Sequence, residues 1–178
     1  MKRILALLIA LLILALPALA ETAEFSPYDY QTGYAGSNSI YYDFPDLELY
    51  LPREWEDALT VEQTEDGVSF YQTASHEKYL EEGIASGGFL FQLRASADES
   101  FRDLPAYEYL GYSENASLHF YALLPSDYPA WTGDAAIQAE YDSMSRQVPA
   151  ALEKAKIRKS AWFYPGDDAV VEDGNGLA

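Results

Sequence analysis

The first clear strand signal in the chain is an alternation of apolar and polar residues that ends at a proline. Leu47, Leu49 and Leu51 alternate with more polar neighbours. Because successive side chains of a strand point to opposite faces, this pattern predicts a strand with one face turned to a core. Pro52 lacks a backbone N–H and ends the pattern, and Trp55 follows in a short turn.

A β-hairpin is predicted where two strand-like segments flank a turn dipeptide. Residues 60–65 and 68–73 lie on either side of Asp66-Gly67. This dipeptide favours a type I′ turn, because both central residues of that turn need positive φ. The sequence therefore predicts two antiparallel strands joined at Asp66-Gly67.

A second hairpin and a central strand follow further along the chain. Gly87-Gly88 precedes residues 89–94, where apolar and polar positions alternate again, and we expect a central strand there. Residues 107–112 and 118–124 are both strand-like and are separated by a short polar segment. This pattern indicates a second antiparallel pair.

After Trp131 the apolar period changes from that of a strand to that of a helix. The apolar residues with helical spacing are Ile137, Tyr141, Met144 and Val148. Thr132 or Asp134 is expected to cap the start of this helix. Pro149 is expected to kink or break it, since proline lacks the N–H and clashes with the preceding turn.

Together these elements predict an α+β domain. We expect an antiparallel sheet of five or six strands, with one long C-terminal amphipathic helix packed on one face. The domain is expected to span residues 44–165. Residues 21–43 hold few aliphatic side chains and are predicted to be an irregular lead-in, and residues 166–178 are predicted to be a disordered acidic tail.

The N-terminus has the layout of a secretory signal. Lys2 and Arg3 precede thirteen residues, 4–16, that are all Ile, Leu or Ala, and Ala18-Leu19-Ala20 has the small-x-small pattern of a cleavage site. As a helix the apolar run would span about 20 Å, less than the ~30 Å of a hydrocarbon core. We therefore expect cleavage after Ala20, a secreted or extracellular location, and no membrane attachment afterwards.

Charge and cysteine content narrow the range of partners and chemistry. With 29 acidic and 11 basic side chains, the formal net charge is −18. Nucleic acids and anionic polymers are disfavoured partners because their binding requires clustered Lys and Arg, whereas a cationic partner is compatible with this charge. The chain contains no cysteine, which excludes thiol catalysis, cysteine-ligated metals and disulfides.

Known catalytic and metal-binding patterns do not match this chain. The sequence holds only two histidines, His76 and His119, and no Gly-x-Ser-x-Gly elbow. The zinc-protease pattern that would begin at His76 fails because Leu80 stands where the second histidine is needed. A calcium loop beginning at Asp167 fails because Glu172 stands where glycine is required. No catalytic residue, metal or cofactor is predicted, and a small exported hydrolase using a carboxylate or histidine site stays an alternative.

The aromatic content suggests a binding role. The chain has 15 Tyr, 8 Phe and 3 Trp, and such side chains either fill a core or form a rigid contact surface. The candidate ligand-binding residues are Tyr50, Trp55, Tyr71, Tyr107, Tyr109, Tyr121 and Trp131. Our leading hypothesis is a non-catalytic exported domain that binds an unknown ligand or protein through an exposed sheet face. A structural module that associates with another exported protein is a third hypothesis.

Four short segments resemble those of a group of small exported domains from Gram-positive anaerobes. They are Leu51-Pro52-Arg53-Glu54-Trp55, Val68-Ser69-Phe70-Tyr71, Gly87-Gly88-Phe89-Leu90-Phe91 and Leu124-Pro125-Ser126-Asp127. The order of elements also resembles the Mog1/PsbP-like sheet fold. The resemblance implies an exported α+β domain. PsbP-like proteins bind metal ions and photosystem partners, but no residue of this chain matches those sites.

Overall fold

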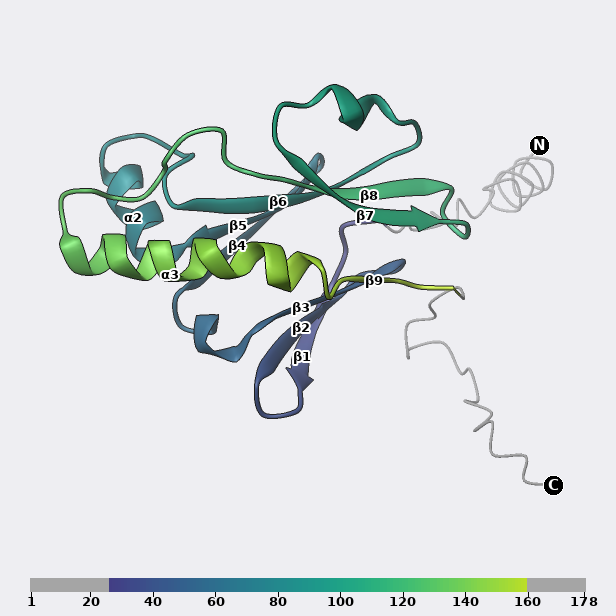
Figure 1. Cartoon of the computed structure of the whole chain (residues 1–178), viewed down its shortest axis with the longest axis horizontal. Coiled ribbons are helices and arrows are strands. Elements are labelled where there is room, and N and C mark those ends of the chain that lie inside the picture. The colour runs from purple at the N-terminus through teal and green to yellow at the C-terminus, as the bar shows by residue number, and fades with distance from the viewer. Residues whose placement is uncertain (1–25, 160–178) are drawn as a thin grey trace, which may run out of the picture.

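The computed structural model describes residues 26–159. The predicted signal peptide (residues 1–20), the start of the lead-in, the last residues of the predicted domain and the predicted acidic tail (166–178) lie outside the described residues. Within residues 26–159 the chain forms two antiparallel sheets and two α-helices, as Figure 1 shows. The predicted α+β class is therefore confirmed.

The first sheet has the strand order β1-β2-β3-β9. Its strands are β1 (Gln31–Ala35), β2 (Ser39–Asp43), β3 (Leu47–Pro52) and β9 (Lys156–Ile157). β1 and β2 correct the prediction that residues 21–43 are irregular. On β2, Ile40 and Tyr42 are buried whereas their neighbours are only half-buried, so the two-residue period is present. Tyrosine takes the place of an aliphatic residue there, because its large ring packs well on a pleated surface.

The second sheet has the order β4-β5-β6-β8-β7, with β6 in the centre as predicted. Its strands are β4 (Leu59–Thr64), β5 (Gly67–Gln72), β6 (Phe89–Ser96), β7 (Tyr107–Ser113) and β8 (Leu118–Leu123). Both predicted hairpins are present. The single sheet of five or six strands was wrong, because alternation indicates which face of a strand is buried but not which strand lies beside it. The short 3-10 helix η1 (Arg53–Trp55) separates the two sheets along the chain.

Helix α3 (Ala135–Leu152) packs against both sheets, through β3 and β6, rather than on one face of a single sheet (Figure 1). Tyr141, Met144 and Val148 of the predicted stripe are buried and join one core cluster with residues of both sheets. The sheets also touch directly, since the rings of Tyr42 and Phe70 meet edge-on at 5.3 Å. The two sheets therefore share a single core.

The two ends of α3 can be compared with the predicted cap and the predicted break at Pro149. The carboxylate of Asp134 accepts hydrogen bonds from the backbone N–H groups of Ala136 and Ile137, at 2.7 and 3.2 Å, so Asp134 is the cap. Pro149 does not break the helix, which continues to Leu152. Burial of the last turn, at Leu152 and the preceding alanine, explains this, because packing outweighs one missing backbone hydrogen bond. A shorter helix, α2 (Thr73–Glu81), follows β5.

The β4–β5 turn lies one residue earlier than the sequence predicts. Thr64 pairs with Gly67, so Glu65 and Asp66 form the turn, and neither has positive φ. Gly67 is needed for another reason: its φ is +157°, and a Cβ atom there would lie 2.3 Å from the carbonyl oxygen of Leu93 on β6. The glycine therefore permits close approach of two strands rather than the turn itself.

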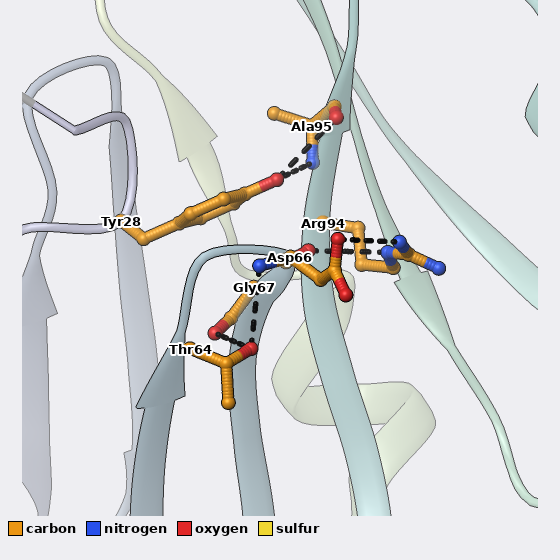
Figure 2. Close-up of polar contacts among 6 residues, drawn as sticks. All are labelled: Tyr28, Thr64, Asp66, Gly67, Arg94 and Ala95. Atoms are coloured by element: carbon orange, nitrogen blue, oxygen red, sulfur yellow. Dashed lines mark hydrogen bonds and ion pairs between the residues drawn. The ribbon is translucent and has the colours of Figure 1, made fainter.

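Polar contacts anchor this hairpin and the N-terminal segment to β6 (Figure 2). The guanidinium Nε of Arg94 donates to the backbone oxygen of Asp66 at 3.1 Å. The hydroxyl of Tyr28 lies 3.1 Å from the backbone N–H of Ala95 and 3.4 Å from its carbonyl oxygen. Tyr28 thereby joins the segment before β1 to the middle of the second sheet.

Replacing Gly67 by alanine should cost far more stability than replacing Gly36, which lies in the open β1–β2 turn. Gly36 has a φ of +68° and no atom within 4 Å of an added Cβ, so Gly36→Ala reports backbone strain alone, about 1 kcal/mol. Gly67→Ala adds the clash with β6, for a total of about 2–4 kcal/mol. Urea unfolding of both variants measures the difference, and equal losses would contradict the close-approach explanation.

Alkaline pH should destabilise the fold through Tyr42. Burial raises the pKa of Tyr42 to about 12, with a smaller contribution from Tyr30. An exposed tyrosine titrates near pH 10, so the contribution of the neutral hydroxyl is complete below pH 10 and is lost as pH rises toward 12. Between pH 10 and 12, the free energy of unfolding of Tyr42→Phe should therefore fall by about 2–3 kcal/mol less than that of the unsubstituted protein. Measurement of the unfolding free energy at several pH values tests this. Tyr112→Phe, at an exposed tyrosine, is the control. If the two variants and the unsubstituted protein lost stability in parallel, the explanation would be wrong.

Candidate functional site

Three of the predicted binding residues meet on the face of β7 and β8 that points away from the core. The rings of Tyr109 and Tyr121 stack on Phe101, with centroids 5.3 and 4.9 Å away, and Tyr107 meets it edge-on at 5.5 Å. Phe101 comes from the 3-10 helix η2 (Ser100–Asp103), in the loop that joins β6 to β7. In Figure 1 this loop forms the arch above the second sheet.

The cluster has a buried floor and an exposed edge. Phe101 and Tyr121 are 1% and 6% exposed, whereas Tyr109 and Tyr112 are 40% and 43% exposed. His119 lies between them: its Nδ1 is 3.1 Å from the Tyr109 hydroxyl, and its ring centroid is 4.7 Å from that of Tyr112. We call Phe101, Tyr107, Tyr109, Tyr112, His119 and Tyr121 the β7–β8 aromatic cluster.

Charged groups from the same loop border this cluster. Arg102 donates to the carboxylate of Glu99 at 2.8 Å, and its guanidinium carbon lies 5.5 Å from the ring centroid of Phe101 and 6.0 Å from that of Tyr109. The hydrogen bond from Arg102 lowers the pKa of Glu99, and hydrogen bonds from Ser100 lower the pKa of Asp98. Asp98 and Glu99 directly precede η2, which carries Phe101, and His119 lowers the two pKa values slightly further.

The remaining predicted residues lie apart from the cluster and from one another. Trp55 is 1% exposed and belongs to the core. Tyr50 is half-buried on β3 of the other sheet. Tyr71 stacks on His76, with centroids 4.1 Å apart, and Trp131 meets another aromatic ring edge-on near α2. The structure therefore gathers part of the predicted aromatic set into one surface.

Sequence patterns missed several members of the cluster. Phe101 lies in a loop, where no periodicity marks a buried residue. Tyr112 falls outside the alternation of Tyr107 and Tyr109 because the register shifts between Tyr109 and Gly111. The one available signal was His119, which the sequence places on the same side of β8 as Tyr121.

His76 has a structural role. Its side chain is buried, with Nδ1 2.9 Å from the carbonyl oxygen of Gly87 and Nε2 3.3 Å from the carboxylate of Glu62. Its ring also stacks on Tyr71. Both ring nitrogens are therefore occupied in joining α2 to β4 and to the segment before β6, which leaves neither to act as a base.

The residue types of a serine–histidine–carboxylate site occur around His119, but their hydrogen bonds differ from those of a catalytic triad. Ser96 is the cross-strand partner of His119. The hydroxyl of Ser96 donates to the carboxylate of Asp98 at 3.1 Å. In a triad the serine donates to the histidine and the carboxylate orients the histidine. Here the carboxylate binds the serine, and Tyr109 contacts the histidine.

Within residues 26–159, no group of three or more histidine or carboxylate side chains is arranged to hold a metal ion. In the same part of the chain no helix has both the length and the apolar character needed to cross a membrane. Comparisons with protein-family models, with curated proteins and with solved structures found no significant match. Any function proposed for this chain therefore has to be argued from its own geometry.

We expect Phe101→Ala to loosen the whole cluster. The substitution removes the ring on which Tyr109 and Tyr121 stack, and loss of a buried phenylalanine costs about 3–5 kcal/mol. Hydrogen exchange of residues 97–106 should accelerate. Tyr112→Ala, at the exposed edge, should cost about 1 kcal/mol or less. If both substitutions had the same small effect, Phe101 would not be the floor of the cluster.

Proposed function

We propose that this protein is an exported, non-catalytic binding module that takes a basic protein segment on the β7–β8 aromatic cluster. The supporting observation is the position of Arg102. Its guanidinium pairs with Glu99 and lies over the rings of Phe101 and Tyr109. The cluster thus already holds one cation of its own chain by a carboxylate and aromatic faces.

An arginine or lysine of a partner would find the same kinds of contact at the open edge of the cluster. Tyr109 and Tyr112 present exposed rings there, and Asp98 and Glu99 supply negative charge. Arg158 and Lys159 share a hollow with Tyr112, so the partner's cation is expected beside Tyr109. Tyrosine suits a contact surface because it is large, rigid and amphipathic. The formal net charge of −18 adds long-range attraction for a basic partner and so speeds association.

Export is part of the proposal and rests on the N-terminal layout, with cleavage after Ala20. The likeness to exported domains of Gram-positive anaerobes and the Mog1/PsbP-like topology also remain proposals. Outside the cell, an acidic chain would attract basic proteins. Because it has no cysteine, it could not be linked to them by disulfide bonds. A protein that contacts such partners needs an exposed surface rather than a deep cleft.

Titration calorimetry with a short Lys/Arg-rich peptide tests this proposal directly. The double variant Tyr109→Ala/Tyr112→Ala should bind at least about 10-fold more weakly, because two exposed aromatic contacts are lost. The control is Tyr128→Ala, at a tyrosine that is 50% exposed but lies outside the cluster. Binding should weaken with added salt.

Two results would overturn the proposal. One is equal affinity for the basic peptide in the double variant and the control. The other is equally tight binding of a Glu-rich peptide of the same length, because the carboxylates beside the cluster should repel it.

A second candidate, a small hydrolase, rests on the cross-strand pair of Ser96 and His119 beside Asp98. For catalysis, the Ser96 side chain would have to rotate so that its hydroxyl donates to His119 instead of to Asp98. We expect the protein to hydrolyse an activated ester no faster than its Ser96→Ala variant does. Turnover that disappears in both Ser96→Ala and His119→Ala would favour the hydrolase over the binding module.

A further inference from the structure

A second surface, far from the cluster along the chain, carries a hollow of about 500 Å³ between β3 and the C-terminal part of α3. It exists because β9 pairs only with Leu47 and Glu48, so the later part of β3 has no neighbouring strand on that side. Side chains from the β2–β3 hairpin, η1 and α3 line it, and we call it the α3–β3 groove. Its volume lies within the range of small-molecule sites.

Two of the three charged side chains that line the groove are cationic, although the chain is strongly acidic. These two are Arg53 and Lys154. Arg53 is held in place, with its guanidinium carbon 4.0 Å from the ring centroid of Tyr34 and its Nε 3.5 Å from Glu56. Within residues 26–159, Lys154 has no carboxylate at ion-pair distance.

One more basic side chain, Lys156, lies beside the groove, whereas Arg158 and Lys159 line a separate hollow with Tyr112. The Nζ of Lys156 lies 4.9 Å from the ring centroid of Tyr50, a lining residue of the groove. Arg158 pairs with both Asp43 and Glu48 and so balances part of their negative charge. At physiological salt, charges more than about 8 Å away are largely screened, so the charged groups close to the groove decide what it attracts.

Two features work against an anion and limit where it can bind. The carboxylate of Glu54 also lines the groove, but its Oε1 already accepts from the side-chain amide of Gln147 at 2.8 Å. The C-terminal end of α3 carries partial negative charge. Lys154 follows the last turn of α3 and offsets it, so the favourable position for an anion is between Lys154 and Arg53.

Tyr50 and the polar lining residues suit a sugar. The Tyr50 hydroxyl donates to Glu48 at 2.5 Å, which fixes the orientation of the ring. The amides of Asn38 and Gln147 line the same hollow. The Tyr50 ring offers an apolar surface beside Lys156, and the amides offer both donors and acceptors to the hydroxyls of a pyranose.

A smaller hollow and a buried donor lie next to the groove. A smaller hollow of about 180 Å³ shares Glu54 and Gln147 with the groove and is also lined by Trp55. The indole N–H of Trp55 is buried and has no hydrogen-bond partner among the described residues. Buried donors are nearly always satisfied, and an ordered water is the usual acceptor at such a position.

We propose that the α3–β3 groove binds a carboxylate-bearing sugar, with the carboxylate between Arg53 and Lys154 and the pyranose ring on Tyr50. The site is separate from the β7–β8 aromatic cluster and takes a ligand of opposite charge. The overall acidity of the chain, which disfavours long anionic polymers, does not prevent this, because one carboxylate engages only the local cations.

Calorimetric titration of residues 21–178 with glucuronate, glucose and acetate tests the proposal. Glucose lacks the carboxylate and acetate lacks the ring, so both should bind at least about 10-fold more weakly than glucuronate. Lys154→Gln should weaken glucuronate binding about 10-fold and remove most of its salt dependence. Lys78→Gln, at a lysine paired with Glu81 on α2, is the matched control and should change nothing.

Chemical-shift changes in the side-chain amides of Asn38 and Gln147 should locate the ligand. No saturable glucuronate binding, equal binding of glucose or acetate, or unchanged binding in Lys154→Gln would each overturn the proposal. The variant Tyr109→Ala/Tyr112→Ala should bind glucuronate normally, which separates this test from that of the aromatic cluster.

Discussion

The packing of α3 between the two sheets is the constraint on which the rest of the structure depends. Tyr141, Met144 and Val148 enter one core with the inner faces of both sheets, and Tyr42 meets Phe70 across it. Because the inward-facing side chains are buried in this core, a partner can contact only the side chains around it. The β7–β8 aromatic cluster lies on the outer face of the second sheet, and the α3–β3 groove lies where β3 of the first sheet meets α3; each is fixed by the same buried scaffold.

Much of the fold could be predicted because its elements carry strong local patterns. β3, β6, both hairpins and the buried stripe of α3 all follow from apolar periodicity. The prediction failed where packing overrode local signals. Residues 31–43 form strands although tyrosines replace aliphatic residues, and α3 continues past Pro149 because its last turn is buried. Division into two sheets could not be predicted, since strand pairing depends on contacts distant in sequence.

The candidate site could be predicted only in part. Tyr107, Tyr109 and Tyr121 share a face by simple alternation, and the structure does bring them together. What joins them is Phe101, a loop residue with no periodic signal. Net charge was a similarly coarse guide. It describes the average field of the chain and led to the proposal of a basic partner, but it does not reveal the two cationic side chains, Arg53 and Lys154, that line the α3–β3 groove.

Hydrogen exchange of residues 21–178, with and without a Lys/Arg-rich peptide, tests the central claim most directly, because it locates the contact surface. The account predicts added protection in residues 98–121, which contain the β6–β7 loop, β7 and most of β8, with little change in α3. Protection concentrated on β3 and α3 instead, or none at saturating peptide, would contradict the assignment of the aromatic cluster as the binding surface.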